Sequence, residues 1–152
     1  IDSCMVNPCY NISEPYIPLM ANARDDQFKL YINDTGLLTC LYGFETKRAI
    51  LNNTILGNAK GGIYENIIAE CLIKRGYKLY YYKPDDNHEL EFLIEKNGAV
   101  VPIEVKSSNS ASVSLKNFIE DFKPEIAYKL ISNRNGIAGV KQTLPHYMVM
   151  FL

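Results

Sequence analysis

Apolar residues recur with regular spacing between residues 62 and 106, where they predict a helix followed by a hairpin of two strands. At about 100° per residue, the apolar residues of positions 62–75 fall on one side of a helix, and Gly76 is suited to end it. In positions 89–95 and 100–106 the apolar residues alternate with others, which is typical of strands. Asn97-Gly98 between them is a strong signal for a tight hairpin turn.

The remaining segments complete an α/β pattern. Further strands are predicted at residues 28–33, 77–83, 126–131 and 147–152, and helices at residues 37–42, 46–56 and 115–122. Residues 57–62 contain three glycines and are expected to form a loop. The unit strand–helix–strand from residue 100 to residue 131 is expected to be a parallel crossover. We therefore predict a mixed central sheet flanked by helices over residues 28–152. Residues 1–27 lack periodicity, contain three prolines and are expected to form an irregular arm or a short strand-and-loop entry.

Composition narrows the class of protein. A length of 152 residues fits one domain, and 47% hydrophobic and 22% charged residues are ordinary for a globular protein. No apolar run is long enough to span a bilayer, so no membrane partner is expected. Sixteen basic and 17 acidic residues argue against a broadly basic nucleic-acid-binding surface, although a local basic cleft stays open. The cysteines form no Cys-x-x-Cys pair and are expected to be reduced thiols of a cytoplasmic protein: Cys4, Cys9, Cys40 and Cys71.

The candidate chemistry lies on the predicted hairpin. Period-two geometry places Glu104 and Lys106 on one face of their strand, and Glu91 of the partner strand shares that face if the hairpin register allows. Two converging carboxylates bind a hard cation such as Mg²⁺, and a lysine beside them can orient a water molecule or stabilise developing phosphate charge. The alternative is a cross-strand ion pair on a solvated hairpin face, and the residues alone leave both open.

Two further features bear on such a site. Glu65 lies at the edge of the apolar face of the predicted helix, where it either faces the hairpin or is a solvated residue favoured by the helix dipole, while Asn66 is expected to face solvent. Residues 106–141 carry a mild basic excess beside the hairpin, which suits a nucleic-acid cleft or an ordinary solvated surface. The basic residues are Lys106, Lys116, Lys123, Lys129, Arg134 and Lys141.

The order of a helix Glu65, a strand Glu91 and the pair Glu104-x-Lys106 resembles the PD-(D/E)xK nuclease superfamily, which includes restriction endonucleases and archaeal Holliday-junction resolvases. Four longer segments together resemble one uncharacterised family, the domain of unknown function 4143, which occurs behind an AAA+ ATPase module in many bacterial and archaeal proteins. These segments are residues 29–38, 62–66, 89–94 and 102–106.

The resemblance implies a restriction-endonuclease-like fold and a set of site residues. It makes Glu91 and Glu104 ligands of Mg²⁺ (or Mn²⁺), with the Val105 carbonyl as a further ligand. It makes Lys106 the catalytic lysine and Glu65 the acid contributed by the helix. The sequence departs from the family in having Glu91 where Asp is usual, and the extra methylene shifts the ion or demands a wider site.

The expected partners follow from a missing ATP-binding motif and from the family resemblance. No Gly-x-x-x-x-Gly-Lys-Ser/Thr motif is present, so no ATP site is expected in this chain. Because the sequence starts at Ile1, we expect either a processed chain or a piece of a longer protein. The resemblance implies that the ATPase module of such a protein lies upstream. The first hypothesis is an Mg²⁺-dependent phosphodiesterase that acts on DNA. The second is a catalytically inactive nuclease-fold domain that acts as a docking or regulatory module. The sequence leaves the oligomeric state open.

Overall fold

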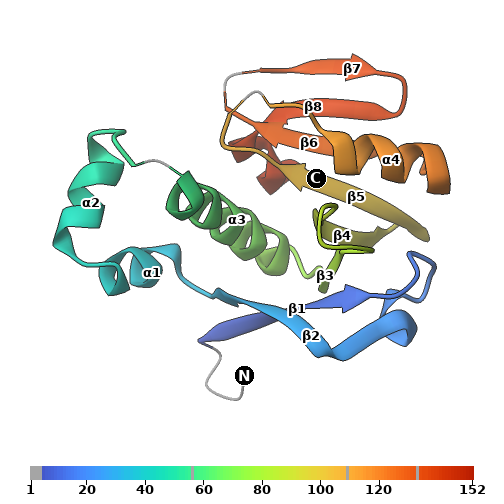
Figure 1. The fold of residues 1–152 in the computed structure, drawn as a ribbon, viewed down its shortest axis with the longest axis horizontal. Helices are drawn as coiled ribbons and strands as arrows, with labels where there is room; N and C mark the ends of the chain where they lie inside the picture. The colour runs from blue at the N-terminus through green and yellow to red at the C-terminus, as the bar shows by residue number, and fades with distance from the viewer. Residues whose placement is uncertain (1–4, 56, 109, 133) are drawn as a thin grey trace.

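An eight-stranded mixed sheet runs through the molecule in the order β2-β1-β3-β4-β5-β6-β8-β7 (Figure 1). The computed structural model describes residues 5–55, 57–108, 110–132 and 134–152. The strands are β1 (Val6–Ile12), β2 (Ala23–Ile32), β3 (Leu79–Tyr82), β4 (Leu90–Lys96), β5 (Ala99–Val105), β6 (Ala127–Ile131), β7 (Gly136–Ala138) and β8 (Lys141–Pro145). The helices are α1 (Thr35–Leu41), α2 (Phe44–Leu51), α3 (Gly57–Lys74) and α4 (Val113–Phe122), with short 3₁₀ helices η1 (Leu19–Asn22) and η2 (His146–Phe151). The predicted α/β class with a mixed sheet is confirmed.

Of the two forms expected for residues 1–27, the irregular arm is wrong within the described part, which begins with a strand and a loop. Residues 6–12 form β1, which pairs antiparallel with β2 and parallel with β3, and β2 already begins at Ala23. Proline usually disfavours a strand because it lacks an N–H group. Pro8 is tolerated because the pairing of β1 with β3 covers only Cys9 to Asn11, so Pro8 has a strand on one side only.

The glycine-containing segment 57–62 is also helical rather than a loop. α3 begins at Gly57, which has a φ of +66°, and continues to Lys74. Glycine lowers helix propensity, but the packing of the following turns against the sheet outweighs that local cost. Gly76 has a φ of +88° and follows the last turn, as predicted. The helix predicted at residues 46–56 is α2 over Phe44–Leu51, and position 56 lies outside the described residues.

The prediction of a final strand at residues 147–152 is wrong. Residues 146–151 form the 3₁₀ helix η2, whose buried residue is Val149. The strand of this region is β8, which lies in register beside β6. β7 pairs antiparallel with β8, in a segment for which no strand was predicted. The sequence of β8, Lys-Gln-Thr-Leu-Pro, has no alternation, which is why no strand was predicted there.

The sheet is covered on both sides. On one face α3 and η2 pack over a cluster that includes Phe92, Ile103 and Leu130. On the other face α4 contributes Leu115 and Phe118 to a second cluster with Leu93. α1 and α2 have no buried residue and extend beyond α3 at the left of Figure 1. No helix among the described residues is long and apolar enough to cross a membrane.

Candidate active site

The predicted hairpin brings Glu91, Glu104 and Lys106 together. Its turn has the positive φ angles of a two-residue hairpin, +54° at Asn97 and +77° at Gly98. The last paired residues of the ladder are Phe92 and Ile103, so the continuing register places Glu91 opposite Glu104. The Lys106 ammonium nitrogen lies 3.0 Å from Glu91 Oε1 and 3.2 Å from Glu104 Oε1. The two carboxylates therefore share one lysine.

A bulge in β4 sets the position of Glu91. Tyr80 pairs with Leu93, but Tyr82 pairs with Leu90, so β4 has one extra residue in this stretch. The bulge turns Leu90 into the cluster under α4, which corrects the prediction that Leu90 and Phe92 share a face. The Glu91 side chain then accepts a hydrogen bond from the Val105 N–H at 3.3 Å, at the point where the backbone ladder ends.

Burial and neighbouring charges shift the pKa values of Glu91 and Lys106. Glu104 is 1% and Glu91 7% exposed. Burial raises the pKa of Glu91 to about 7, with Lys106 opposing the rise and Glu104 adding to it. Burial alone would lower the pKa of Lys106, but the two carboxylates outweigh burial and raise it. Lys106 therefore carries its proton at neutral pH, while Glu91 is poised near the point of half-protonation.

One acceptor in this cluster has no protein partner. Glu104 Oε2 is buried and receives no hydrogen bond from any described residue. A buried carboxylate oxygen left unpaired is costly, and a bound cation is a common solution. The site thus fits an Mg²⁺ ion that Glu91, Glu104 and a backbone oxygen such as that of Val105 would hold. No group of three or more Asp, Glu, His or Cys residues suited to a metal occurs in the described part of the chain, so the protein offers only two carboxylates.

The structure places Glu65 in a different cluster. The Tyr31 hydroxyl donates to Glu65 Oε2 at 3.2 Å, and Lys29 lies 3.7 Å from the same oxygen. Lys29 also forms an ion pair with Glu89 at the entrance to β4. Among the described residues, no hydrogen bond or ion pair joins Glu65 to Glu91, Glu104 or Lys106. Glu65 is linked to the hairpin through Lys29 and Glu89, and through Tyr31, whose ring lies 5.3 Å from that of Phe92 between centroids.

The expectation that Asn66 faces solvent is wrong, because this residue is buried. Its side-chain oxygen accepts from the Ile32 N–H at 2.8 Å, and its side-chain nitrogen donates to the Ile32 carbonyl at 2.9 Å. The same nitrogen donates to the Thr35 hydroxyl at 3.0 Å. Asn66 thus joins α3 to the end of β2, which fixes the helix that carries Glu65.

Of two further residues beside the site, His146 was missed, and Lys129 was predicted only as one of the basic residues that flank the hairpin. His146 Nε2 lies 3.0 Å from the Lys106 carbonyl oxygen, and its ring stacks on Tyr64 of α3 at 4.4 Å between centroids. Burial lowers the pKa of His146, so the ring is neutral and Nε2 donates to the carbonyl. Lys129 of β6 is buried beside Glu104. The parallel crossover predicted from residue 100 to 131 was the signal that β6 lies next to β5, but it does not fix the register.

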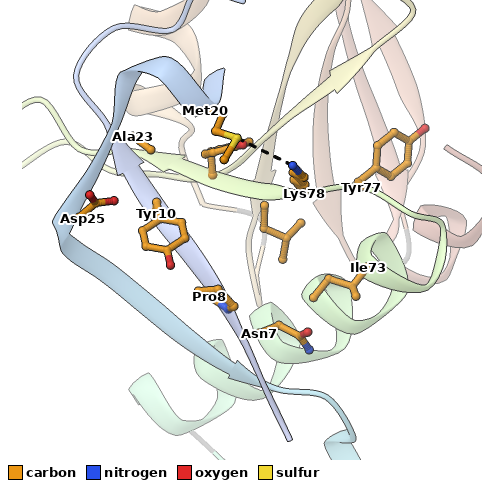
Figure 2. Close-up of a pocket in the computed structure, with 11 residues that line it drawn as sticks. Asn7, Pro8, Tyr10, Met20, Ala23, Asp25, Ile73, Tyr77 and Lys78 are labelled. Carbon is orange, nitrogen blue, oxygen red and sulfur yellow. Dashed lines mark hydrogen bonds between the residues drawn. The ribbon is translucent and has the colours of Figure 1, made fainter. Parts of the chain in front are cut away.

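A cavity of about 440 Å³ lies elsewhere, between β1, β3, η1 and the end of α3 (Figure 2). Tyr10, Tyr77 and Met20 line it, and Lys78 contacts the Met20 sulfur at 3.9 Å. None of the candidate site residues lines this cavity, so its size does not bear on the acidic site. Cys9, Cys40 and Cys71 are free thiols, and Cys4 lies outside the described residues.

Comparison with known proteins gives a family but no activity. The family described as "Domain of unknown function (DUF4143)" matches residues 60–142. Two uncharacterized proteins, Mb2031c of Mycobacterium bovis and Rv2008c of Mycobacterium tuberculosis, are each 33% identical to this chain over 86 residues. The match covers 57% of this chain and 19% of each relative. No solved structure matches. The matched residues include most of α3, the whole β4–β5 hairpin and β6, and by this match the chain belongs to the DUF4143 family.

Proposed function

We propose that the chain is an Mg²⁺-dependent nucleic-acid phosphodiesterase with DNA as its substrate. The observation that carries the proposal is the convergence of Glu91, Glu104 and Lys106, in which Glu104 Oε2 is buried without a partner. The resemblance to the PD-(D/E)xK superfamily supports a restriction-endonuclease-like arrangement of the same sheet. An AAA+ ATPase module upstream in the same protein and a cytoplasmic location belong to this proposal.

Each residue has a role that follows from its surroundings. Glu91, Glu104 and the Val105 carbonyl would hold the ion, which when bound polarises the phosphate and lowers the pKa of a water molecule. Lys106 is charged and cannot act as the initial base, so it orients the attacking water and stabilises the phosphate oxygen that gains negative charge. Glu65 acts as a positioning residue, because Lys29 links it to Glu89 just before Glu91.

Metal binding tests the proposal most directly. Calorimetric titration of the chain with Mn²⁺ and Mg²⁺ is expected to give one site, and Glu104→Gln is expected to abolish it because a neutral amide is a poor ligand for a hard cation. Glu120→Gln is the matched control, since Glu120 lies exposed on α4 and pairs only with Lys116. Binding that survives Glu104→Gln, or no binding at saturating metal, contradicts the metal site. Cleavage of labelled DNA by the wild type but not by Lys106→Met then tests the reaction.

A second candidate is the docking or regulatory module without turnover. It is favoured by the small number of acidic ligands in the described chain, since only two carboxylates converge and both already pair with Lys106. Glu91 in place of the usual Asp points the same way. This candidate predicts binding to a protein partner that is insensitive to salt, whereas a cleft for DNA predicts a steep loss of DNA affinity with salt.

A further inference from the structure

A buried lysine lies beside the carboxylate pair, on the neighbouring strand. Lys129 of β6 pairs in register with Glu104 of β5, so the two side chains lie side by side on parallel strands. Ile103 and Val105 belong to the core under α3, as do Tyr128 and Leu130. By alternation, Glu104 and Lys129 both project from the opposite face, the one that α4 covers. Lys129 is only 7% exposed, and lysine is rarely so buried unless it is paired.

The partner of Lys129 in the described structure is a neutral group. Its ammonium donates to the Ser110 carbonyl at 2.6 Å, and no ion pair joins it to a described carboxylate. Lys106 contacts Glu104 Oε1, and Glu104 Oε2 has no partner. Among the described residues, a lysine that makes no direct ion pair therefore lies next to a carboxylate oxygen that receives no hydrogen bond. A bound phosphodiester would supply the negative oxygen that this lysine lacks.

Other cations surround the same place. Burial lowers the pKa of Lys129, Glu104 raises it, and Lys141, Lys106 and Arg134 lower it further through their positive charge. Lys141 of β8 pairs in register with Ala127, two residues before Lys129, and so lies on the same face of the next strand. A chain whose formal net charge is −1 thus gathers positive charge across β5, β6 and β8. Such a local field attracts a polyanion.

We propose that Lys129 is a phosphate-contacting residue, and that a nucleic-acid backbone crosses β5, β6 and β8 from the Glu91–Glu104 pair toward Lys141. This inference rests on the proposed function, because it identifies the groups that bind the substrate of that site. A non-bridging phosphate oxygen takes the place of the Ser110 carbonyl as acceptor for the Lys129 ammonium. Lys141 then contacts a neighbouring phosphate. These contacts carry no base information, so binding is independent of DNA sequence.

The experiment measures DNA binding without cleavage. Fluorescence anisotropy with a short labelled DNA duplex, in EDTA and over a series of salt concentrations, is expected to show that Lys129→Gln lowers the affinity about tenfold at low salt. The slope of log affinity against log salt is expected to fall by about 1. Lys129→Arg keeps both the charge and the slope. Lys141→Gln is expected to act in the same direction as Lys129→Gln. Lys116→Gln, on the exposed side of α4, is the matched control and leaves binding unchanged.

The outcomes separate this inference from the proposed function. The inference is overturned if Lys129→Gln and Lys141→Gln both bind DNA with the affinity and the salt slope of the wild type. This result leaves the proposed function standing, because the metal titration of Glu104→Gln tests that function independently. Absence of salt-dependent DNA binding by the wild type also overturns it, and the metal titration then tells whether the proposed function fails as well. Thermal unfolding of Lys129→Gln checks its fold. If that variant does not fold, the slope of Lys141→Gln decides the matter, because Lys141 is only half-buried at the start of β8.

Discussion

Asn66 uses both ends of its side-chain amide to hold the backbone at the end of β2. Asn66→Ala is expected to lower the free energy of unfolding by about 2–4 kcal/mol, because it leaves the N–H and the carbonyl of Ile32 without partners in a buried place. Urea unfolding measures the loss. Asn58→Ala, at an exposed position of the same helix, serves as the control and is expected to stay within about 0.5 kcal/mol of the wild type. Equal effects of the two substitutions would contradict the structural role of Asn66.

Glu91 makes the stability of the metal-free chain depend on pH. Its ordinary pKa of 4.5 applies in the unfolded chain, and burial raises it to about 7 in the folded one. Between these values the folded state binds more protons than the unfolded state, so the free energy of unfolding falls as pH rises. Glu91→Gln removes this contribution, and its stability is expected to change less between pH 4.5 and pH 7. Urea unfolding in EDTA measures the free energy of unfolding of the wild type and of Glu91→Gln at each pH. If the two proteins show the same dependence on pH, the raised pKa of Glu91 is contradicted.

At the residue scale, the sequence predicts contacts between residues that lie close together along the chain. Glu91, Glu104 and Lys106 could be brought together from a two-residue turn and a two-residue period, since both signals lie within the hairpin. The positions of Asn66 and Lys129 could not, because they depend on how β2 and β6 pack against elements far away in the sequence. Glu65 was correctly placed at the edge of the helix face, but its contacts lie on β2, whose course was not predicted beyond residues 28–33.

Glycine has opposite effects in the two elements that carry the site. Gly62 lies in α3 with helical geometry, and a Cβ there would meet no atom within 4 Å. Gly62→Ala is expected to stabilise the protein by about 0.5–1 kcal/mol. Gly98→Ala is expected to destabilise it by about 1 kcal/mol, because φ is +77° in the hairpin turn. Thermal unfolding of the two variants compares them, and a gain in stability for Gly98→Ala would be inconsistent with this turn.

The elements missed by the sequence share a physical reason. β1 contains Asn7, Pro8 and Asn11 and becomes a strand only because β2 and β3 lie on either side of it. β8 has no alternation of its own and exists as a strand through its parallel pairing with β6. Local propensity decides little in such strands, since cross-strand packing dominates. The elements with strong internal patterns, α3 after residue 62 and the β4–β5 hairpin, were predicted correctly.

The molecule consists of a sheet with two covered faces and an uncovered pair of helices. Phe44 and Leu51 of α2 are 71% and 76% exposed, while Phe92 of β4 is fully buried. Phe44→Ser combined with Leu51→Ser is therefore expected to change the free energy of unfolding by less than about 0.5 kcal/mol for each residue. Phe92→Ala is expected to cost about 3–5 kcal/mol. Urea unfolding distinguishes the two cases, and a large loss in the double variant would mean that α2 packs against the body of the protein.

The position of β1 between β2 and β3 has a consequence for folding during translation. β1 and β2 are synthesised before the rest of the sheet, but Cys9 of β1 pairs with Leu79 of β3, which follows only after three helices. Until then Cys9 and Tyr31 of this ribbon have neither the sheet nor α3 to cover them. Pairings between distant segments form late and leave apolar surface exposed to other chains. A ribosome paused before β3 would therefore hold a nascent ribbon that depends on a chaperone to stay apart from its neighbours.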